Sequence, residues 1–319
     1  MSHWDNISTE HLRGAGTPAE AAALFKAAVR MVEIEVFSYC NRLCWFCPNK
    51  DGSRIGSNTY MDVGLYESIV RRLADIRYDG MISYSRYNEP LADPVILDRI
   101  AFARQTLPEA KLHTNTNGDY LTPDLLARLR DAGLNTLNIQ IYLKNFERYD
   151  HEKVRARGEQ TLARLGAPAR MVKDQPGVWL EWRIEYEGMT IRLYGRNFDV
   201  NGTSRGDTVD IAREFRRTAP CIIPAWAVYI DHDGSMVPCC NLRSDIPEHE
   251  DTVIARLSPA VDLFEAYAGA RLASWRRALA SFEEKQGVCR SCRFAQEPDT
   301  TATRAHSARL LADPVRPAP

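Results

Sequence analysis

Three cysteines lie close together near the start of the chain, in the segment EVFSYCNRLCWFCPNK (residues 35–50). Cys40, Cys44 and Cys47 are separated by three and then two residues, and they follow the apolar run VEIEVF. Three thiolates can ligate three irons of a cubane [4Fe-4S] cluster, whose full set would be four, and leave the fourth iron open to a substrate or cosubstrate. The alternatives are a zinc site completed by a His or Asp from elsewhere, and buried thiols without a metal.

The other five cysteines lie in the last hundred residues of the chain. Cys289 and Cys292 form a CxxC pair, while Cys221, Cys239 and Cys240 precede them. One centre could gather ligands from this set, and the spacing alone fits a four-cysteine zinc ribbon as well as an iron-sulfur cluster.

Composition narrows the class of protein. The 319 residues include 41 Lys+Arg and 42 Asp+Glu, with both signs interspersed, which argues against nucleic acid as the main partner. The N-terminal residues have no signal-peptide pattern, and no apolar run approaches the roughly 20 residues that span a bilayer. We therefore expect no membrane partner and a cytoplasmic location, where thiols stay reduced and serve as metal ligands or catalytic groups.

Strand and helix patterns alternate through the first two thirds of the chain. A first helix is predicted from Thr17, with Pro18 at its first position and Glu20 completing a capping box. This alternation predicts an α/β fold with a parallel sheet and right-handed crossovers, either an open doubly wound sheet or a complete or partial barrel. The strand-like segments are residues 32–38, 80–85, 110–114, 135–142 and 178–186, and the helix-like segments between them are 62–77, 94–106, 122–132 and 144–165.

The pattern changes after residues 196–207, which are predicted to be a linker. A β-hairpin is predicted around Asp233-Gly234, followed by a helix over 261–283. The last residues, from 297, are expected to be poorly ordered. We divide the chain into an N-terminal extension and helix (1–30), a main α/β domain (31–205), a small cysteine-bearing domain (206–296) and a tail (297–319).

The first cysteine loop resembles the signature of the radical S-adenosylmethionine (SAM) superfamily, CxxxCxφC, with Phe46 at the aromatic position. The resemblance implies a partial (β/α)6-type barrel and two cofactors, a [4Fe-4S] cluster bound by Cys40, Cys44 and Cys47, and SAM chelated to the open iron. It also implies an electron donor such as flavodoxin or ferredoxin. The resulting 5'-deoxyadenosyl radical would abstract hydrogen from a substrate carbon, while the protein supplies orientation and excludes water.

Further segments resemble superfamily motifs. SRYNEPL resembles the GGEP motif beside the SAM methionine, with Asn88, Glu89 and Pro90 at its last three positions, although Asn-Glu-Pro also fits a helix-start turn. Asn117, in TNTNGDYLT, is expected to contact SAM or to form a plain turn, and Gln140 is a candidate ribose contact.

Arg183 belongs to a charged row on a predicted strand. In LEWRIEYE, alternation places Glu181, Arg183 and Glu185 on one face. Arg183 is therefore either a substrate ligand lining a cavity or the partner of an acidic neighbour.

The second cysteine set resembles the twitch domain, a short form of the SPASM extension. The resemblance implies that Cys221, Cys239, Cys289 and Cys292 hold one auxiliary [4Fe-4S] cluster, which leaves Cys240 over. Cys240 is interpreted as a hydrogen-atom donor to a substrate radical, with the alternative that it replaces Cys239 as the ligand.

The relatives suggest a small polar substrate, such as a carbohydrate, aminoglycoside or nucleoside-like intermediate of antibiotic biosynthesis. The spare thiol favours epimerisation, with Cys240 as donor. The alternative is oxidation of a carbinol to a ketone, with the auxiliary cluster as electron acceptor. Peptide modification is a further alternative, disfavoured because the 30 residues before the first strand are fewer than a leader-binding domain needs. The last alternative is that the chain is a non-catalytic iron-sulfur or zinc protein.

Overall fold

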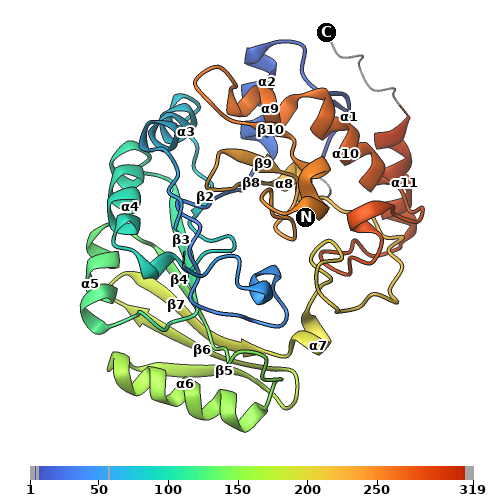
Figure 1. Cartoon of the computed structure of the whole chain (residues 1–319). Helices are drawn as coiled ribbons and strands as arrows, with labels where there is room; N and C mark the ends of the chain where they lie inside the picture. The colour runs from blue at the N-terminus through green and yellow to red at the C-terminus, as the bar shows by residue number, and fades with distance from the viewer. Residues whose placement is uncertain (1–3, 5–6, 57, 313–319) are drawn as a thin grey trace. The chain divides into compact units, whose positions relative to one another are not determined.

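The computed structural model describes residues 4, 7–56 and 58–312, and the chain divides into two compact units (Figure 1). The large-sheet unit combines Ile34–Met61 with Asp79–Gly202. The hairpin unit combines Met1–Glu33, Asp62–Tyr78 and Thr203–Pro319. Within the described ranges, no helix has both the length and the apolar composition needed to cross a membrane.

The large-sheet unit contains six strands in the order β2-β3-β4-β7-β6-β5. The first four are parallel neighbours, while β6 pairs antiparallel with both β7 and β5. Figure 1 shows α4, α5 and α6 along one side of these strands. The predicted α/β fold with a parallel sheet is confirmed. The strands are β2 (Met81–Ser83), β3 (Lys111–Thr116), β4 (Thr136–Gln140), β5 (Ala169–Gln175), β6 (Trp179–Tyr186) and β7 (Met189–Arg196). The helices are η2 (Pro48–Asp51), η3 (Pro90–Ala92), α4 (Val95–Thr106), α5 (Pro123–Asp131), α6 (His151–Leu165) and α7 (Phe198–Asn201).

The fifth predicted strand, residues 178–186, is present as β6, but it does not continue the parallel series. Glu187 and Gly188, both with positive φ, turn the chain directly into β7, so that Tyr186 pairs with Met189. Two consecutive positive φ values suit a two-residue hairpin turn. The strand that follows β4 in the parallel series is therefore β7. Neither β7 nor β5 was predicted from the sequence.

Helix α6 begins later than the prediction of 144–165. The Asp150 side chain accepts a hydrogen bond from the Lys153 N–H and caps the helix, and Gly166 ends it in the left-handed conformation. Residues 144–150 form a loop before the helix. This loop matters below because it contacts the first cysteine loop.

The hairpin unit contains the strand order β10-β9-β8-β1 and most of the short helices. The predicted hairpin is β8 and β9, with Gly234 at φ +83° in its turn. The helix predicted over 261–283 is interrupted, because the chain is extended at Gly269. The strands are β1 (Met31–Ile34), β8 (Ala227–Ile230), β9 (Ser235–Val237) and β10 (Ala255–Arg256). The helices are α1 (Thr9–Arg13), α2 (Pro18–Ala28), α3 (Val63–Asp75), α8 (Ile223–Trp226), η4 (Pro247–Thr252), α9 (Leu263–Ala268), α10 (Ala270–Ala280), η5 (Gly287–Cys289) and α11 (Thr301–Leu311).

Two predictions at the ends of the chain need correction. Thr17 caps α2 as predicted, but the Glu20 carboxylate accepts the N–H of Gly16, so the capping box is not closed on Thr17. The tail is not irregular over residues 301–311, which form α11. Thr300 caps this helix, and Leu310 packs in an apolar cluster that includes Trp4 and Leu12. The end of the predicted tail, 313–319, lies outside the described residues.

Gly195 of β7 is required by close packing against α6. A Cβ at this position would lie 2.3 Å from Cγ1 of Val154. We expect Gly195→Ala to lower the free energy of unfolding by about 1–3 kcal/mol, as overpacked cores do. Chemical denaturation is the measurement. In the Val154→Ala background, Gly195→Ala should lower the free energy of unfolding by less than it does in the wild-type protein, because the clashing Cγ1 is gone. Equal losses in the two backgrounds would contradict this packing.

Candidate active site

Cys40, Cys44 and Cys47 lie together in the loop after β1. The Cys40 N–H donates to the carbonyl oxygen of Arg54 (3.1 Å), and the Cys47 N–H donates to that of Cys44 (3.0 Å). Burial raises the pKa of Cys40 to about 12, and burial together with the neighbouring thiols raises the pKa of Cys44 further. Bound iron would reverse this penalty, because a metal stabilises thiolates. The donor set therefore suits a metal cluster.

Arg42 fastens this loop to the ends of β3 and β4. Its guanidinium donates to both carboxylate oxygens of Asp119, at 2.7 and 2.5 Å, and to the carbonyl oxygen of Leu143 at 2.9 Å. Burial opposes ionisation of Asp119, yet Arg42 lowers its net pKa. This fork-to-carboxylate pair was missed in the sequence, where 77 residues separate its members and no local pattern joins them.

The loop contacts continue toward α6. Asn145 accepts the Leu43 N–H at 3.0 Å, and Trp45 donates its indole N–H to the Glu147 carbonyl oxygen at 3.2 Å. Arg148 lies over the Trp45 ring, 3.6 Å from its centroid. Residues 143–148 therefore support the first cysteine loop along its length.

Glu89 is buried at the ends of β2 and β3. Its carboxylate accepts the Leu91 N–H (3.1 Å), the Thr116 hydroxyl (2.5 Å) and the Asn117 N–H (2.7 Å). Its own N–H donates to the carbonyl oxygen of Tyr39, next to Cys40. Burial raises the pKa of Glu89 to about 7. Glu89 is thus the common anchor of three loops.

Asn88 and Gln140 each present a buried amide nitrogen that lacks a hydrogen-bond partner among the described residues. Asn88 is 8 % exposed and its Oδ1 accepts the Arg86 N–H, while Gln140 is 7 % exposed and its Oε1 accepts the hydroxyls of Tyr142 and Tyr194. A buried donor without an acceptor costs about 1–3 kcal/mol. A polar ligand at this edge of the sheet would supply the missing acceptors.

The remaining residues predicted to contact SAM have protein partners in the structure. Asn117 donates its amide to Asn41 and accepts the Asp119 N–H, so it orders its own turn. Pro90 opens η3, consistent with the helix-start interpretation of Asn-Glu-Pro. Phe46 stacks on Phe198, with centroids 3.4 Å apart.

One face of the large sheet is lined with polar side chains, and we call it the polar face. The Asn138 amide donates to Asn115 at 2.8 Å, and Asn115 in turn donates to Ser85 at 2.5 Å. The alternate positions of β3, β4 and β7 point to the helix-bearing side and are mostly buried aliphatic residues, which is why this face can be polar without loss of the core. The polar face comprises Ser83, Ser85, His113, Asn115, Thr136, Asn138, Gln140, Glu181, Arg183, Arg192 and Tyr194.

Arg183 lies on the polar face and pairs with Glu181, as the alternative interpretation anticipated. Its Nε donates to the Glu181 carboxylate at 3.0 Å, and its side chain is 47 % exposed. Arg192 donates to the same carboxylate at 2.8 Å. Burial opposes ionisation of Glu181, yet Arg192 lowers its net pKa. A role of Arg183 toward a substrate stays a prediction.

In the hairpin unit, the other five cysteines lie in one group. Burial raises the pKa of Cys221 to about 11, with Cys292 and Cys240 adding to it, and the hydrogen bond that the protonated Cys239 thiol shares with Cys240 raises the pKa of Cys239. Burial raises the pKa of Cys289 to about 12. Cys240 therefore lies among the candidate ligands rather than apart from them.

Donors from nearby residues point at these thiols. The Asn241 N–H lies 3.4 Å from Sγ of Cys239, and Arg217 and the Asn241 amide each lie 3.9 Å from Sγ of Cys292. All eight cysteines are described and none forms a disulfide. In the described ranges, no three His, Cys, Asp or Glu side chains converge as a site for a single metal ion.

The sequence matches the model of the radical SAM superfamily over residues 34–161. It is 36% identical over 215 residues to the S-adenosyl-L-methionine-dependent 2-deoxy-scyllo-inosamine dehydrogenase of Niallia circulans, a match covering 66% of this chain and 72% of that protein. The chain belongs to the radical SAM superfamily. The radical SAM assignment made from the CxxxCxφC motif is thereby confirmed.

Two solved structures share the radical SAM fold seen here. The crystal structure of BtrN in complex with AdoMet and 2-DOIA matches with a TM-score of 0.58 and 22% identity, over 79% of this chain and 87% of that one. Selenomethionine BtrN in an open conformation matches with a TM-score of 0.54 and 20% identity, over 84% and 92% of the two chains.

Replacing Glu89 tests its role as the common anchor. We expect Glu89→Ala to lower the free energy of unfolding by about 2–4 kcal/mol, because the N–H groups of Leu91 and Asn117 lose their buried acceptor. Glu89→Gln keeps an acceptor oxygen and should lose clearly less. Urea denaturation of both variants makes the comparison, and equal losses would contradict an anchoring role for the hydrogen bonds.

The buried His113 is expected to make the free energy of unfolding depend on pH. Burial lowers its pKa from 6.5 to about 4, so it is neutral in the fold and protonates first in the unfolded chain. Stability from this group is present above pH 6.5 and lost as the pH falls toward 4, by about 3 kcal/mol at most. His113→Gln should flatten the fall in unfolding free energy over this range. His11 also has its pKa lowered to about 4, so His11→Gln measures the remaining slope.

Proposed function

We propose that this radical SAM enzyme is a dehydrogenase that oxidises a carbinol of an aminocyclitol-like molecule to a ketone. The polar face is the observation that carries the proposal. Its serine, asparagine and carboxylate groups suit a molecule rich in hydroxyl and amino groups, and an apolar face would not. The 36% identity to an aminocyclitol dehydrogenase supports the same reaction.

For the first cofactor site, we propose that Cys40, Cys44 and Cys47 hold a [4Fe-4S] cluster. When bound, this cluster and SAM supply the 5'-deoxyadenosyl radical that removes a hydrogen atom from the substrate carbon. The buried amides of Asn88 and Gln140 would donate hydrogen bonds to SAM. Glu89 would act as a positioning residue that fixes the neighbouring loops.

The same site gives three other residues supporting roles in this proposal. Asn117 would border SAM through the turn that Glu89 holds. Phe46 and Pro90 would shape the walls of the site. These roles limit water and fix orientation, and they require no proton transfer.

For the hairpin unit, we propose a twitch-like auxiliary [4Fe-4S] cluster on Cys221, Cys239, Cys289 and Cys292. The hydrogen bond between Cys239 and Cys240 leaves either thiol available as the ligand. Such a cluster would accept the electron that the substrate radical loses, while the hydroxyl proton passes to a base or to solvent and the carbinol becomes a ketone. A flavodoxin or ferredoxin would supply the electron that starts the reaction.

Oxidation now takes precedence over epimerisation, which the spare cysteine had favoured. The dehydrogenase relative matches the alternative reaction, and Cys240 has a place among the auxiliary thiols that needs no reaction with substrate. Peptide modification and a non-catalytic role have no comparable support from the relative.

The reaction can be tested with 2-deoxy-scyllo-inosamine as first substrate. With anaerobically reconstituted enzyme, SAM and dithionite in heavy water, we expect 5'-deoxyadenosine and a product two mass units lighter than substrate. Mass spectrometry reads both. A product carrying one solvent deuterium at carbon, and lost in Cys240→Ala, would instead establish epimerisation. Failure to form 5'-deoxyadenosine with any aminocyclitol would sink the proposal.

Iron content tests the two clusters separately. We expect about eight irons per reconstituted chain, four from each cluster. The variant Cys40→Ala/Cys44→Ala/Cys47→Ala should keep about four irons and make no 5'-deoxyadenosine. Cys289→Ala/Cys292→Ala should also keep about four, yet still cleave SAM. Single Cys239→Ala and Cys240→Ala variants then identify the ligand, and a wild-type content of four irons would exclude the auxiliary cluster.

A further inference from the structure

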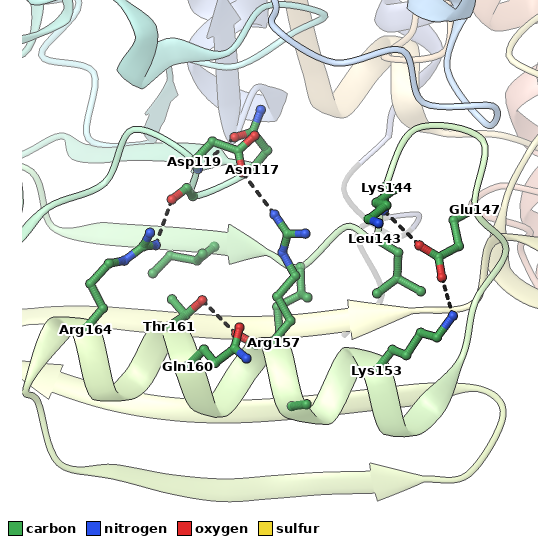
Figure 2. A pocket seen from close by; sticks show the side chains of 14 residues that line it. Asn117, Asp119, Leu143, Lys144, Glu147, Lys153, Arg157, Gln160, Thr161 and Arg164 are labelled. Atoms are coloured by element: carbon green, nitrogen blue, oxygen red, sulfur yellow. Dashed lines mark hydrogen bonds and ion pairs between the residues drawn. The ribbon is translucent and has the colours of Figure 1, made fainter.

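A pocket of about 470 Å³ lies in the large-sheet unit on the helix-bearing side of the sheet (Figure 2). Its floor is apolar and formed by Ile139, Ile141 and Leu143, at the end of β4. Figure 2 shows Arg157 and Arg164 rising from α6 toward the turn that contains Asn117 and Asp119. The pocket is thus separate from the polar face, which is on the opposite side of the same strands.

The lining of this pocket has an excess of positive charge. Four cations line it, Lys144, Lys153, Arg157 and Arg164, against two carboxylates, Asp119 and Glu147. Asp119 is already paired at both oxygens with Arg42. Arg157 reaches Asp119 only at 3.3 Å, and Glu147 is engaged by Lys153 at 2.6 Å. The available carboxylates therefore do not neutralise the four cations.

The electrostatics of Arg157 agree with this count. Burial lowers the pKa of Arg157, and repulsion from Arg42 and Arg164 adds to that effect against the attraction of Asp119. An anion placed between the guanidiniums would remove the repulsion. Because the site is partly desolvated, the gain would exceed that of a surface ion pair.

The helix sets the spacing of the cations. Lys153, Arg157 and Arg164 fall on one face of α6, since residues four and seven apart share a face. Arg157 and Arg164 are separated by about 10.5 Å along the axis, from a rise of 1.5 Å per residue. One guanidinium can donate two parallel hydrogen bonds to two oxygens of the same phosphate group. An elongated ligand with a phosphate group and an apolar or ring-shaped body fits this row and the aliphatic floor.

We propose that this pocket binds a phosphate-bearing small molecule, a phosphomonoester or a diphosphate. The ligand is distinct from the proposed aminocyclitol, whose ammonium group the cationic lining would repel. Asp119 contacts both Arg157 of the pocket and Arg42 of the first cysteine loop. An anion that engages Arg157 therefore changes the charge around the carboxylate that fastens that loop.

Calorimetric titration of the anaerobic, full-length protein with pyrophosphate tests the proposal. We expect saturable binding that weakens as salt is raised, and a rise of about tenfold or more in Kd for Arg157→Gln, from loss of a charged hydrogen-bond donor. Arg155→Gln is the matched control. Arg155 lies on the same helix outside the pocket and pairs with Asp174, so its loss should leave Kd unchanged.

Two further variants keep the test decisive. Arg164 also donates to the Gly118 carbonyl oxygen, so Arg164→Gln removes a contact that helps to order the fold as well as a pocket cation. Lys144 lies on an exposed loop, and Lys144→Gln should weaken binding without an effect on folding. Absence of saturable pyrophosphate binding would overturn the proposal, as would equal weakening by Arg155→Gln. None of these readouts uses SAM cleavage, so they stand apart from the proposed dehydrogenase activity.

Discussion

The geometry of the cofactor end of the large sheet depends on one buried carboxylate. Glu89 joins the turn after β2 to the turn after β3 through its oxygens, and joins both to the first cysteine loop through its own N–H. A buried charge is expensive unless hydrogen bonds surround it, and here three donors do so. The cost of burying this group is thus offset most fully when all three loops are in place, which couples their positions.

The arrangement separates two chemical tasks. Burial raises the pKa of the thiols in the first cysteine loop, while the polar face of the strands presents amide and hydroxyl groups together with the paired charges of Glu181, Arg183 and Arg192. The second thiol group belongs to a unit with its own short strands and apolar clusters. Each group of thiols therefore has polar residues beside it, Arg42 and Asp119 in one case, Arg217 and Asn241 in the other.

The sequence predicted what local chemistry determines. Cysteine spacing identified the superfamily, and the signals at Thr17 and Asp233-Gly234 placed a helix start and a hairpin correctly. It could not predict that β7 rather than β6 extends the parallel series, because β6 and β7 have similar patterns and only pairing distinguishes them. The Arg42 contact to Asp119 joins loops far apart in sequence, and α11 depends on apolar residues near the other end of the chain.

The alternation of the strands bears on how such a protein changes over evolutionary time. Side chains of the polar face contribute little to the aliphatic layer beneath α5 and α6, since successive residues point to opposite sides. Exchanges at Asn115, Asn138 or Arg192 would therefore change the polar network on one side of the strands and leave the aliphatic packing on the other side in place. A sheet of this kind can change the groups that it presents on one face without changing the residues that pack its helices on the other.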